Sequence, residues 1–361
     1  MKKLFTAAFL LALAFALTSC VSAEKKVQGD IETNLTNLKN LDEGAIDALM
    51  AEMVPTESGY KDFFSEMLKN LEYEIVAVEK KEGNEAVSVE VNLKSKEIDG
   101  LIDQYYNEII TGNIDAVLIN QPVDKQSIND SALLNLLTEY KGKYLLLNDI
   151  TINRVFEYKK DGANWGMQNK ADFYNAVLGD FIKKVEVYKT DKLPALFIES
   201  FLGRLKSINT EHIAALSGAG QANNVQFELY AKFYNNMDYE ILKTESLGEG
   251  KTKFNIRLDI IDSGKTFKDF GDKYIQYIKN SIDTKKTPTN SELETQTYKL
   301  LMESIDGNKT NKASKETTLI VNSVLDIENL TEFFKVVFDD VSLNSANTTK
   351  EISERMQNLY S

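Results

Sequence analysis

The spacing of hydrophobic residues after position 30 predicts that the chain opens with helices. Apolar residues three or four positions apart predict an amphipathic helix over 31–41, a short helix over 45–49 and a third helix over 60–71. Each would bury one apolar face. The face of the third predicted helix is formed by Phe63, Phe64, Met67, Leu68 and Leu71.

The hydrophobic period then changes from that of a helix to that of a strand. Val87, Val89 and Val91 alternate with polar neighbours, as does the run that begins at Tyr73, and a Gly-Asn pair lies between the two runs. This pattern predicts a β-hairpin with one buried face. A second hairpin is predicted around Lys160-Asp161-Gly162. Between and after the hairpins, helical spacing returns over 98–110, 133–140 and 173–181.

The same succession of predicted helices and hairpins occurs a second time in the chain. Residues 70–75 return as residues 236–241 with four identities at one offset (236 − 70 = 166). A repeat of this length indicates a duplicated domain rather than a short solenoid unit. Near the end of each copy the offset falls to 160, so the second copy is shorter. It has no clear equivalent of Lys159 to Gly162, and Leu325 stands where the first copy has Trp165.

The pattern predicts an α+β fold of two tandem domains, each with helices packed on a curved antiparallel sheet. The expected domains are residues 30–185 and 192–345, with the boundary near Val185 to Lys192. Residues 346–361 are expected to form a tail with a short helix, since Ile352, Met356 and Leu359 keep helical spacing.

The N-terminus predicts export and lipidation. Lys2 and Lys3 precede an apolar run that ends in Leu17-Thr18-Ser19-Cys20, a pattern that resembles a bacterial lipobox. Cleavage between Ser19 and Cys20 would remove residues 1–19 and leave Cys20 as the lipidated first residue, with residues 20–29 as a tether. The protein is then expected on the cell membrane or outer membrane, facing the periplasm or the exterior. The alternative is an ordinary secretory signal with an incidental cysteine.

Composition narrows the classes of partner. The 361 residues are 43% apolar and 27% charged, as in an ordinary globular protein. The chain has 55 acidic against 42 basic residues and no basic stripe, which argues against a nucleic-acid partner. Cys20 is the only cysteine, so no disulfide can form within the chain.

Two segments of the first copy resemble a known class of domain. Gly83-Asn84-Glu85-Ala86-Val87 and Tyr158 to Trp165, which contains a Lys-Lys-Asp-Gly turn, are similar to segments of uncharacterised bacterial lipoprotein domains. Those domains are grouped with the cystatin-like, nuclear-transport-factor-two-like cone folds. The resemblance covers most of residues 30–182 and, more weakly, residues 193–340. It implies a cone fold and carries over no catalytic residue.

Candidate catalytic chemistry is sparse. His212 is the only histidine, so neither a Ser-His-Asp or Cys-His arrangement nor a typical zinc site is expected. Residues 306–310 resemble the start of a calcium loop, but Asn311 and Thr317 replace its glycine and glutamate, and a surface turn is expected there. A pair of carboxylates that converge in a cleft remains an alternative.

Aromatic residues of the first copy are the candidate ligand site. Cone folds can leave a pocket between the sheet and its covering helices, and tyrosine or tryptophan suits such a pocket. The alternative is that the rings fill the core. The candidate pocket residues are Trp165, Tyr158, Phe156, Tyr105 and Tyr106.

The sequence therefore predicts a non-enzymatic, membrane-anchored exported lipoprotein without a cofactor or metal. It would be held to the membrane by the lipid on Cys20 and bind an envelope protein or a small ligand through a pocket or a sheet face. One alternative is a structural spacer or scaffold of the envelope. A carboxylate-dependent hydrolase is a further, weaker alternative.

Overall fold

The structure, a computed structural model, describes residues 22–53, 59–81, 85–119, 122–162, 164–217, 225–322 and 324–360. The lipobox residues Ser19 and Cys20 lie outside this part of the chain. Within it, no helix combines the length and hydropathy that a membrane span requires. The chain divides into two compact units. Unit 1 holds the described residues up to Glu108 and Gln126–Tyr188, and unit 2 holds Ile109–Lys125 and the chain from Lys189 onward.

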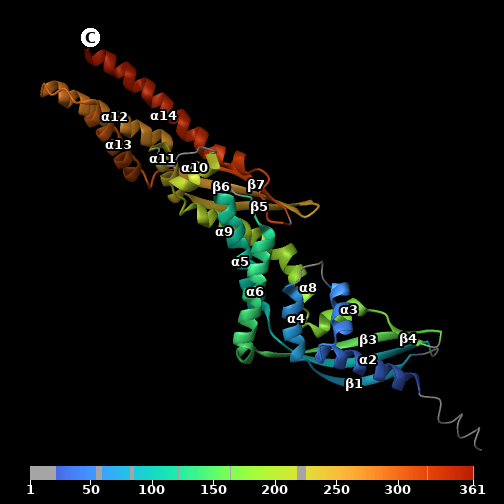
Figure 1. The fold of residues 1–361 in the computed structure, drawn as a ribbon. Helices are drawn as coiled ribbons and strands as arrows, with labels where there is room; N and C mark the ends of the chain where they lie inside the picture. The colour runs from blue at the N-terminus through green and yellow to red at the C-terminus, as the bar shows by residue number, and fades with distance from the viewer. Residues whose placement is uncertain are drawn as a thin grey trace, which may run out of the picture. The chain divides into compact units, whose positions relative to one another are not determined.

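Unit 1 is built on a four-stranded antiparallel sheet of order β1-β2-β3-β4 (Figure 1). Helices precede the first strand, connect β2 to β3 and follow β4. The strands are β1 Glu72–Lys80, β2 Ala86–Lys96, β3 Asp149–Asp161 and β4 Asn164–Met167. The helices are α2 Ala23–Lys39, α3 Glu43–Met53, α4 Gly59–Lys69, α5 Asp99–Leu118, α6 Lys125–Lys143, the 3₁₀ turn η1 Tyr144–Leu146, α7 Lys170–Val177 and α8 Phe181–Val187.

The predicted alternation of β2 is confirmed. Val87, Val89 and Val91 are fully buried, and their neighbours along the strand are half-buried or exposed. Helices α2 and α7 both pack on the strands of this sheet. A sheet with one covered face and one solvated face explains why polar residues alternate with the valines. The two predicted hairpins, β1–β2 and β3–β4, both form.

Unit 2 contains the same order of elements on a sheet of order β5-β6-β7. A five-residue π-helix, Tyr188–Lys192, leads into it. Its strands are β5 Asp238–Gly248, β6 Lys251–Ile261 and β7 Lys312–Val321. Its helices are α9 Leu193–Leu205, α10 Thr210–Ser217, α11 Val225–Asn235, α12 Ser263–Asp283, α13 Asn290–Gly307 and α14 Leu330–Tyr360. The α+β class with two antiparallel sheets is therefore confirmed.

Unit 2 also includes Ile109–Lys125, which holds the second half of α5 and the first residue of α6. Arg204 on α9 pairs with Asp115 at 3.1 Å, and Lys125 pairs with Asp326 at 2.8 Å. Ile110 and Ile114 in this segment are buried. Helix α5 thus contributes its first half to one unit and its second half to the other.

The C-terminus differs from the sequence-based expectation. A single helix of 31 residues, α14, replaces the predicted closing helix and separate short helix. In unit 1 the corresponding helix α7 ends at Val177, two residues before Gly179, whose φ is +67°. The residue at that offset in unit 2 is Asp339 (339 − 179 = 160), which continues the helix. The extension packs on α12, where a Cβ added to Gly271 would lie 3.0 Å from Thr348 (Figure 1).

Candidate functional site

Four of the five predicted pocket residues lie in the core of unit 1. Phe156, Tyr105, Tyr106 and Tyr158 are between 0% and 4% exposed. Phe156 packs edge-on against Phe173 with ring centroids 5.3 Å apart, and Tyr106 stacks on Tyr188 at 4.6 Å. The Tyr105 hydroxyl lies 3.1 Å from the Tyr60 hydroxyl. The rings of Phe156, Tyr105 and Tyr106 therefore pack against other aromatic rings of the core.

Trp165 is the exception, because it is only half-buried. It lies opposite Lys160 in the β3–β4 ladder, and Met167 lies opposite Tyr158. Directly opposed residues point to the same face of an antiparallel sheet, and residues two apart on one strand do so as well. Trp165 and Met167 therefore continue the face on which Tyr158 is buried. Burial, together with the nearby Asp30 carboxylate, raises the pKa of the Tyr158 hydroxyl.

A groove of about 370 Å³ opens at this end of the sheet. It lies between the C-terminal end of α3, which contributes Glu52, and the segment that joins β4 to α7. Trp165 does not line the groove but shares a strand face with Met167, which does. The remaining lining residues are Gln168, Asn169, Lys170, Ala171 and Asp172.

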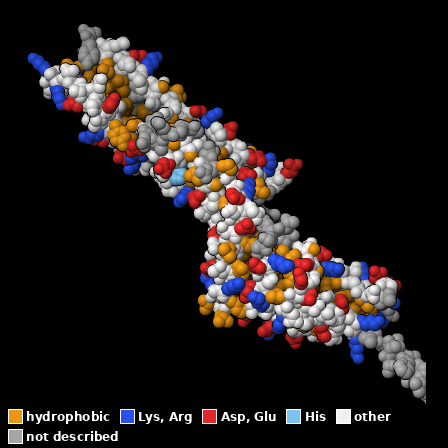
Figure 2. Space-filling model, in the orientation of Figure 1, with side chains coloured by type: hydrophobic (Ala, Val, Ile, Leu, Met, Phe, Trp, Pro, Cys, Tyr) orange, Lys and Arg blue, Asp and Glu red, His pale blue; other side chains and the backbone are white. Residues whose placement is uncertain are grey.

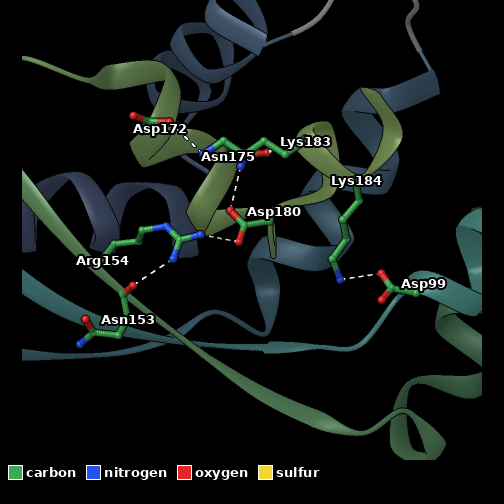
Figure 3. A network of polar contacts seen from close by, with 8 residues as sticks. All are labelled: Asp99, Asn153, Arg154, Asp172, Asn175, Asp180, Lys183 and Lys184. Atoms are coloured by element: carbon green, nitrogen blue, oxygen red, sulfur yellow. Dashed lines mark hydrogen bonds and ion pairs between the residues drawn. The ribbon is translucent and has the colours of Figure 1, made fainter. Parts of the chain in front are cut away.

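A polar network fixes the helix that forms one wall of the groove (Figure 3). Arg154 on β3 donates to Asp180 at 2.6 Å, and Asp180 accepts a second bond at 2.8 Å from the buried Asn175 of α7. Asn175 accepts in turn from the backbone N–H of Lys183 at 3.1 Å. The Lys183 ammonium pairs with Asp172 on the groove wall at 3.1 Å. The network therefore ties α7 and α8 to the sheet.

Unit 2 has a bridge of the same kind. Lys315 on β7 donates to Asp340 on α14 at 2.5 Å. Arg154 lies opposite Val91 and Lys315 lies opposite Leu258, which are equivalent positions of the repeat (258 − 91 = 167). The two aspartates are also equivalent (340 − 180 = 160). This bridge was not predicted from the sequence. The recurrence of aspartate at the offset of 160, which holds near the end of each copy, could have indicated it.

The strand that borders the groove, β4, has no counterpart among the described residues of unit 2. The second sheet has three strands among the described residues, and the chain after β7 makes a single bridge, Val321 to Ile327, where the first sheet has β4. Asn329 instead bonds to β7, where its side chain donates to the Thr318 carbonyl at 2.8 Å. The fourth strand and Trp165 thus distinguish the first repeat from the second.

His212 has a structural role at the start of α10. Its Nδ1 accepts a hydrogen bond from the Asn209 N–H at 3.2 Å, and its own N–H donates to the Asn209 side chain at 3.0 Å. This reciprocal pair is the arrangement of a capping box, with an imidazole in place of a carboxylate.

The calcium-like segment forms a short turn, as expected. Helix α13 extends to Gly307 and β7 begins at Lys312, so the connection is shorter than the loop predicted over 306–312. Asp306 pairs with Lys309 at 2.9 Å. In the described part of the chain, no three histidine, cysteine or acidic residues are grouped so that they could hold a metal ion.

Comparisons of the chain with known protein families, with curated proteins and with solved structures each found no match.

Proposed function

We propose that this chain is an exported, lipid-anchored, non-enzymatic binding protein built from two tandem cystatin-like domains. Its ligand site is the groove beside Trp165 in unit 1. The ligand is a small molecule of the cell envelope or a segment of an envelope protein. The observation that carries this proposal is the difference between the repeats, since the first repeat adds a strand and a tryptophan that the second does without.

The difference matters because the second unit forms its sheet and core from three described strands. A fourth strand such as β4 is therefore not needed to complete this fold. A half-buried tryptophan at the end of a strand leaves apolar surface in contact with water, which is unfavourable unless something covers it. Tryptophan combines a large apolar face with one polar N–H, as is common at binding sites.

The groove has the mixed lining that binding sites for polar organic ligands have. Met167 and Ala171 offer apolar contact, while Lys170, Glu52 and the amides of Gln168 and Asn169 offer charges and hydrogen bonds. A volume of about 370 Å³ is at the small end of the range for ligand pockets. We therefore favour a ligand or peptide segment with both apolar and polar groups.

The lipid anchor would bring this site to a membrane surface. Residues 23–29, which were expected to belong to a tether, form the start of α2, so only Val21 and Ser22 separate Cys20 from this helix. Replacement of Cys20 by Ala should abolish incorporation of radiolabelled palmitate and move the protein from the membrane fraction to the soluble or secreted fraction. Unchanged labelling and fractionation of this variant would contradict the anchor.

The site itself can be tested by fluorescence, because Trp165 is the only tryptophan of the chain. Excitation at an indole-selective wavelength therefore reports on one position beside the groove. Fractions of envelope extract that contain the ligand should shift the emission saturably, and Lys170→Ala should weaken this response. Lys350→Ala, on the exposed face of α14, is the control. A ligand that binds the chain without a change in emission would place the site elsewhere.

One observation favours a second candidate function. Glu52 and Asp172 line the same groove, and two carboxylates in one cleft could act as acid and base of a hydrolase. Asp172 is, however, paired with Lys183, and both side chains are about half exposed, at 50% and 53%. If the groove only binds a ligand, Glu52→Gln and Asp172→Asn should alter the affinity for that ligand and should abolish no hydrolytic activity. Loss of a hydrolytic activity in both variants would support the enzyme instead.

A further inference from the structure

The most exposed large hydrophobic residues among those described lie together on one turn. Leu145 is 89% exposed and Leu146 is 82% exposed. They form the 3₁₀ turn η1 with Tyr144, between α6 and β3. Hydrophobic side chains come to the surface over this end of α6 in Figure 2. Adjacent exposed leucines are unfavourable in water, so an apolar partner is expected to cover them.

The turn is held firmly at its base. Lys96 on β2, whose side chain is only 12% exposed, donates to the Leu147 carbonyl at 3.2 Å and pairs with Asp149 at 2.6 Å. The same ammonium group lies 4.8 Å from the centre of the Tyr144 ring. Tyr140 also packs edge-on against Tyr144, with ring centroids 5.6 Å apart. Because Lys96 and Tyr140 both hold Tyr144, the turn that carries the two leucines is well ordered.

We infer that Leu145 and Leu146 insert into the acyl layer of a phospholipid bilayer and give unit 1 a second contact with the membrane. The residues around the leucines suit the headgroup region. Lys141 and Lys143 precede the leucines and pair with Glu66 and Glu139 at the surface. Both lysine side chains are about half exposed, so these weak surface pairs can be exchanged for lipid phosphates. The lysines favour phosphate groups and the tyrosine favours the interface.

A bilayer fits better than a protein pocket because of where the chain would be anchored. This inference rests on the lipid anchor of the proposed function, which keeps a membrane within reach. The Thr36 hydroxyl, near the C-terminal end of α2, lies 3.1 Å from the Tyr73 hydroxyl at the start of β1, and α2 packs along β1 and β2. Glu24, in the first turn of α2, feels the charge of Lys80, so α2 begins near the end of β1. Lys96 and Asp149 mark the other end of the sheet. Two contacts separated by the length of β2, roughly 35 Å, would lay the sheet along the membrane.

The test places an environment-sensitive fluorophore on the turn of the full lipidated protein. Leu145→Cys is expressed with its signal sequence, labelled with a nitrobenzoxadiazole maleimide and reconstituted into phosphatidylethanolamine–phosphatidylglycerol vesicles. Leu134→Cys, on α6 of the same unit and 63% exposed, is the matched control. The label count separates the two claims, because a lipidated Cys20 leaves one reactive thiol per chain and an unmodified Cys20 leaves two.

We expect a blue shift and quenching by nitroxide-labelled lipids at position 145, both smaller after Leu146→Asp, and neither at position 134. Equal responses at positions 145 and 134, or none at 145, would overturn the inference whatever the label count. A shift that appears without vesicles and grows with protein concentration would also overturn it and assign the leucines to contact between copies. A chain with two labels that still shows the vesicle response would retain the inference and refute the anchor.

Discussion

Arg154 on β3 donates to Asp180 at 2.6 Å, and the equivalent pair of unit 2, Lys315 and Asp340, repeats this bridge at 2.5 Å. Each pair joins the third strand of a sheet to the segment that follows it. The aspartate is kept in both repeats, while the base changes from arginine to lysine. A feature retained after so much divergence indicates a requirement of the fold rather than of a ligand.

We expect Asp180→Asn to destabilise unit 1, because the substitution removes the charge from a part-buried bond between strand and helix. The Asp180 side chain is 21% exposed. Loss of a hydrogen bond to a charged group costs about 1.5–3 kcal/mol. Asparagine tolerates the positive φ of this residue, so backbone strain should contribute little. Urea unfolding followed by Trp165 fluorescence measures the effect. Asp47→Asn, at the exposed Lys61–Asp47 pair, should cost less than about 1 kcal/mol, and an equal loss in both variants would contradict this account.

Gly179 is a second position at which the fold of unit 1 restricts the residue type. Its φ is +67°, and a Cβ there would lie 2.6 Å from the Ser95 hydroxyl of β2. Gly179→Ala should cost about 1–3 kcal/mol from the backbone alone, with a further steric contribution that Ser95→Ala relieves. Gly203→Ala, in the open interior of α9, should be neutral or stabilising by up to about 1 kcal/mol. Additivity of Gly179→Ala and Ser95→Ala in thermal or urea unfolding would show that the two side chains do not collide.

His212 should contribute to stability but not to ligand binding. Asn209→Ala and His212→Ala each remove part of the reciprocal cap of α10, and the loss of a helix cap costs about 1 kcal/mol. Because each side chain bonds to the backbone of the other residue, the double variant should cost less than the sum of the two single variants. Unfolding curves of the three variants measure this. Retained stability with lost ligand response in His212→Ala would show that the histidine has a functional role.

Asp272 on α12 should stabilise the fold at neutral pH and lose this effect in acid. Hydrogen bonds from Lys268 at 2.8 Å and Arg355 at 2.7 Å hold the pKa of its carboxyl below the ordinary value. The stabilisation is therefore fully present above about pH 4 and is lost as the pH falls through the lower, folded-state pKa. The side chain is 46% exposed, so solvent screening leaves less than about 1 kcal/mol.

The measurement for Asp272 is the gap in melting temperature between the wild type and Asp272→Asn, followed from pH 7 to pH 2. The gap should narrow in acid and also in high salt. A difference in melting temperature that widens in acid would contradict the lowered pKa of Asp272 in the folded protein.

Local pattern predicted the elements of the fold well. The alternation of Val87 to Val91 predicted a strand with one buried face, which is confirmed. Phe254, Ile256 and Leu258, the residues 167 positions later in the second copy, are buried in the same way. The unbroken α14 was missed, because the polar residues after Val341 hide a helix whose other face packs on α12. Such packing depends on a partner distant in sequence.

The candidate site was predicted less well for a similar reason. Phe156, Tyr158, Tyr105 and Tyr106 have the composition of a pocket, but the contacts that make them core come from α7, α4 and Tyr188. Only Trp165 could be distinguished, because the comparison between repeats showed that the fold can do without it. The groove residues Gln168 to Asp172 have no pattern of their own, and their position follows from the β4–α7 turn.

The central claim is that the chain carries an envelope ligand beside Trp165. The most direct measurement is native mass spectrometry of the full protein, purified in its native lipidated form from the envelope of its source cell. The wild type is compared with Trp165→Ala and with Tyr298→Ala, which removes an aromatic ring of unit 2 that is 39% exposed. The account predicts a reproducible added mass, beyond that of the lipid anchor, on the wild type and on Tyr298→Ala, and its loss from Trp165→Ala. An added mass retained by folded Trp165→Ala would contradict the site, and wild-type protein with no added mass or bound partner would contradict the binding function.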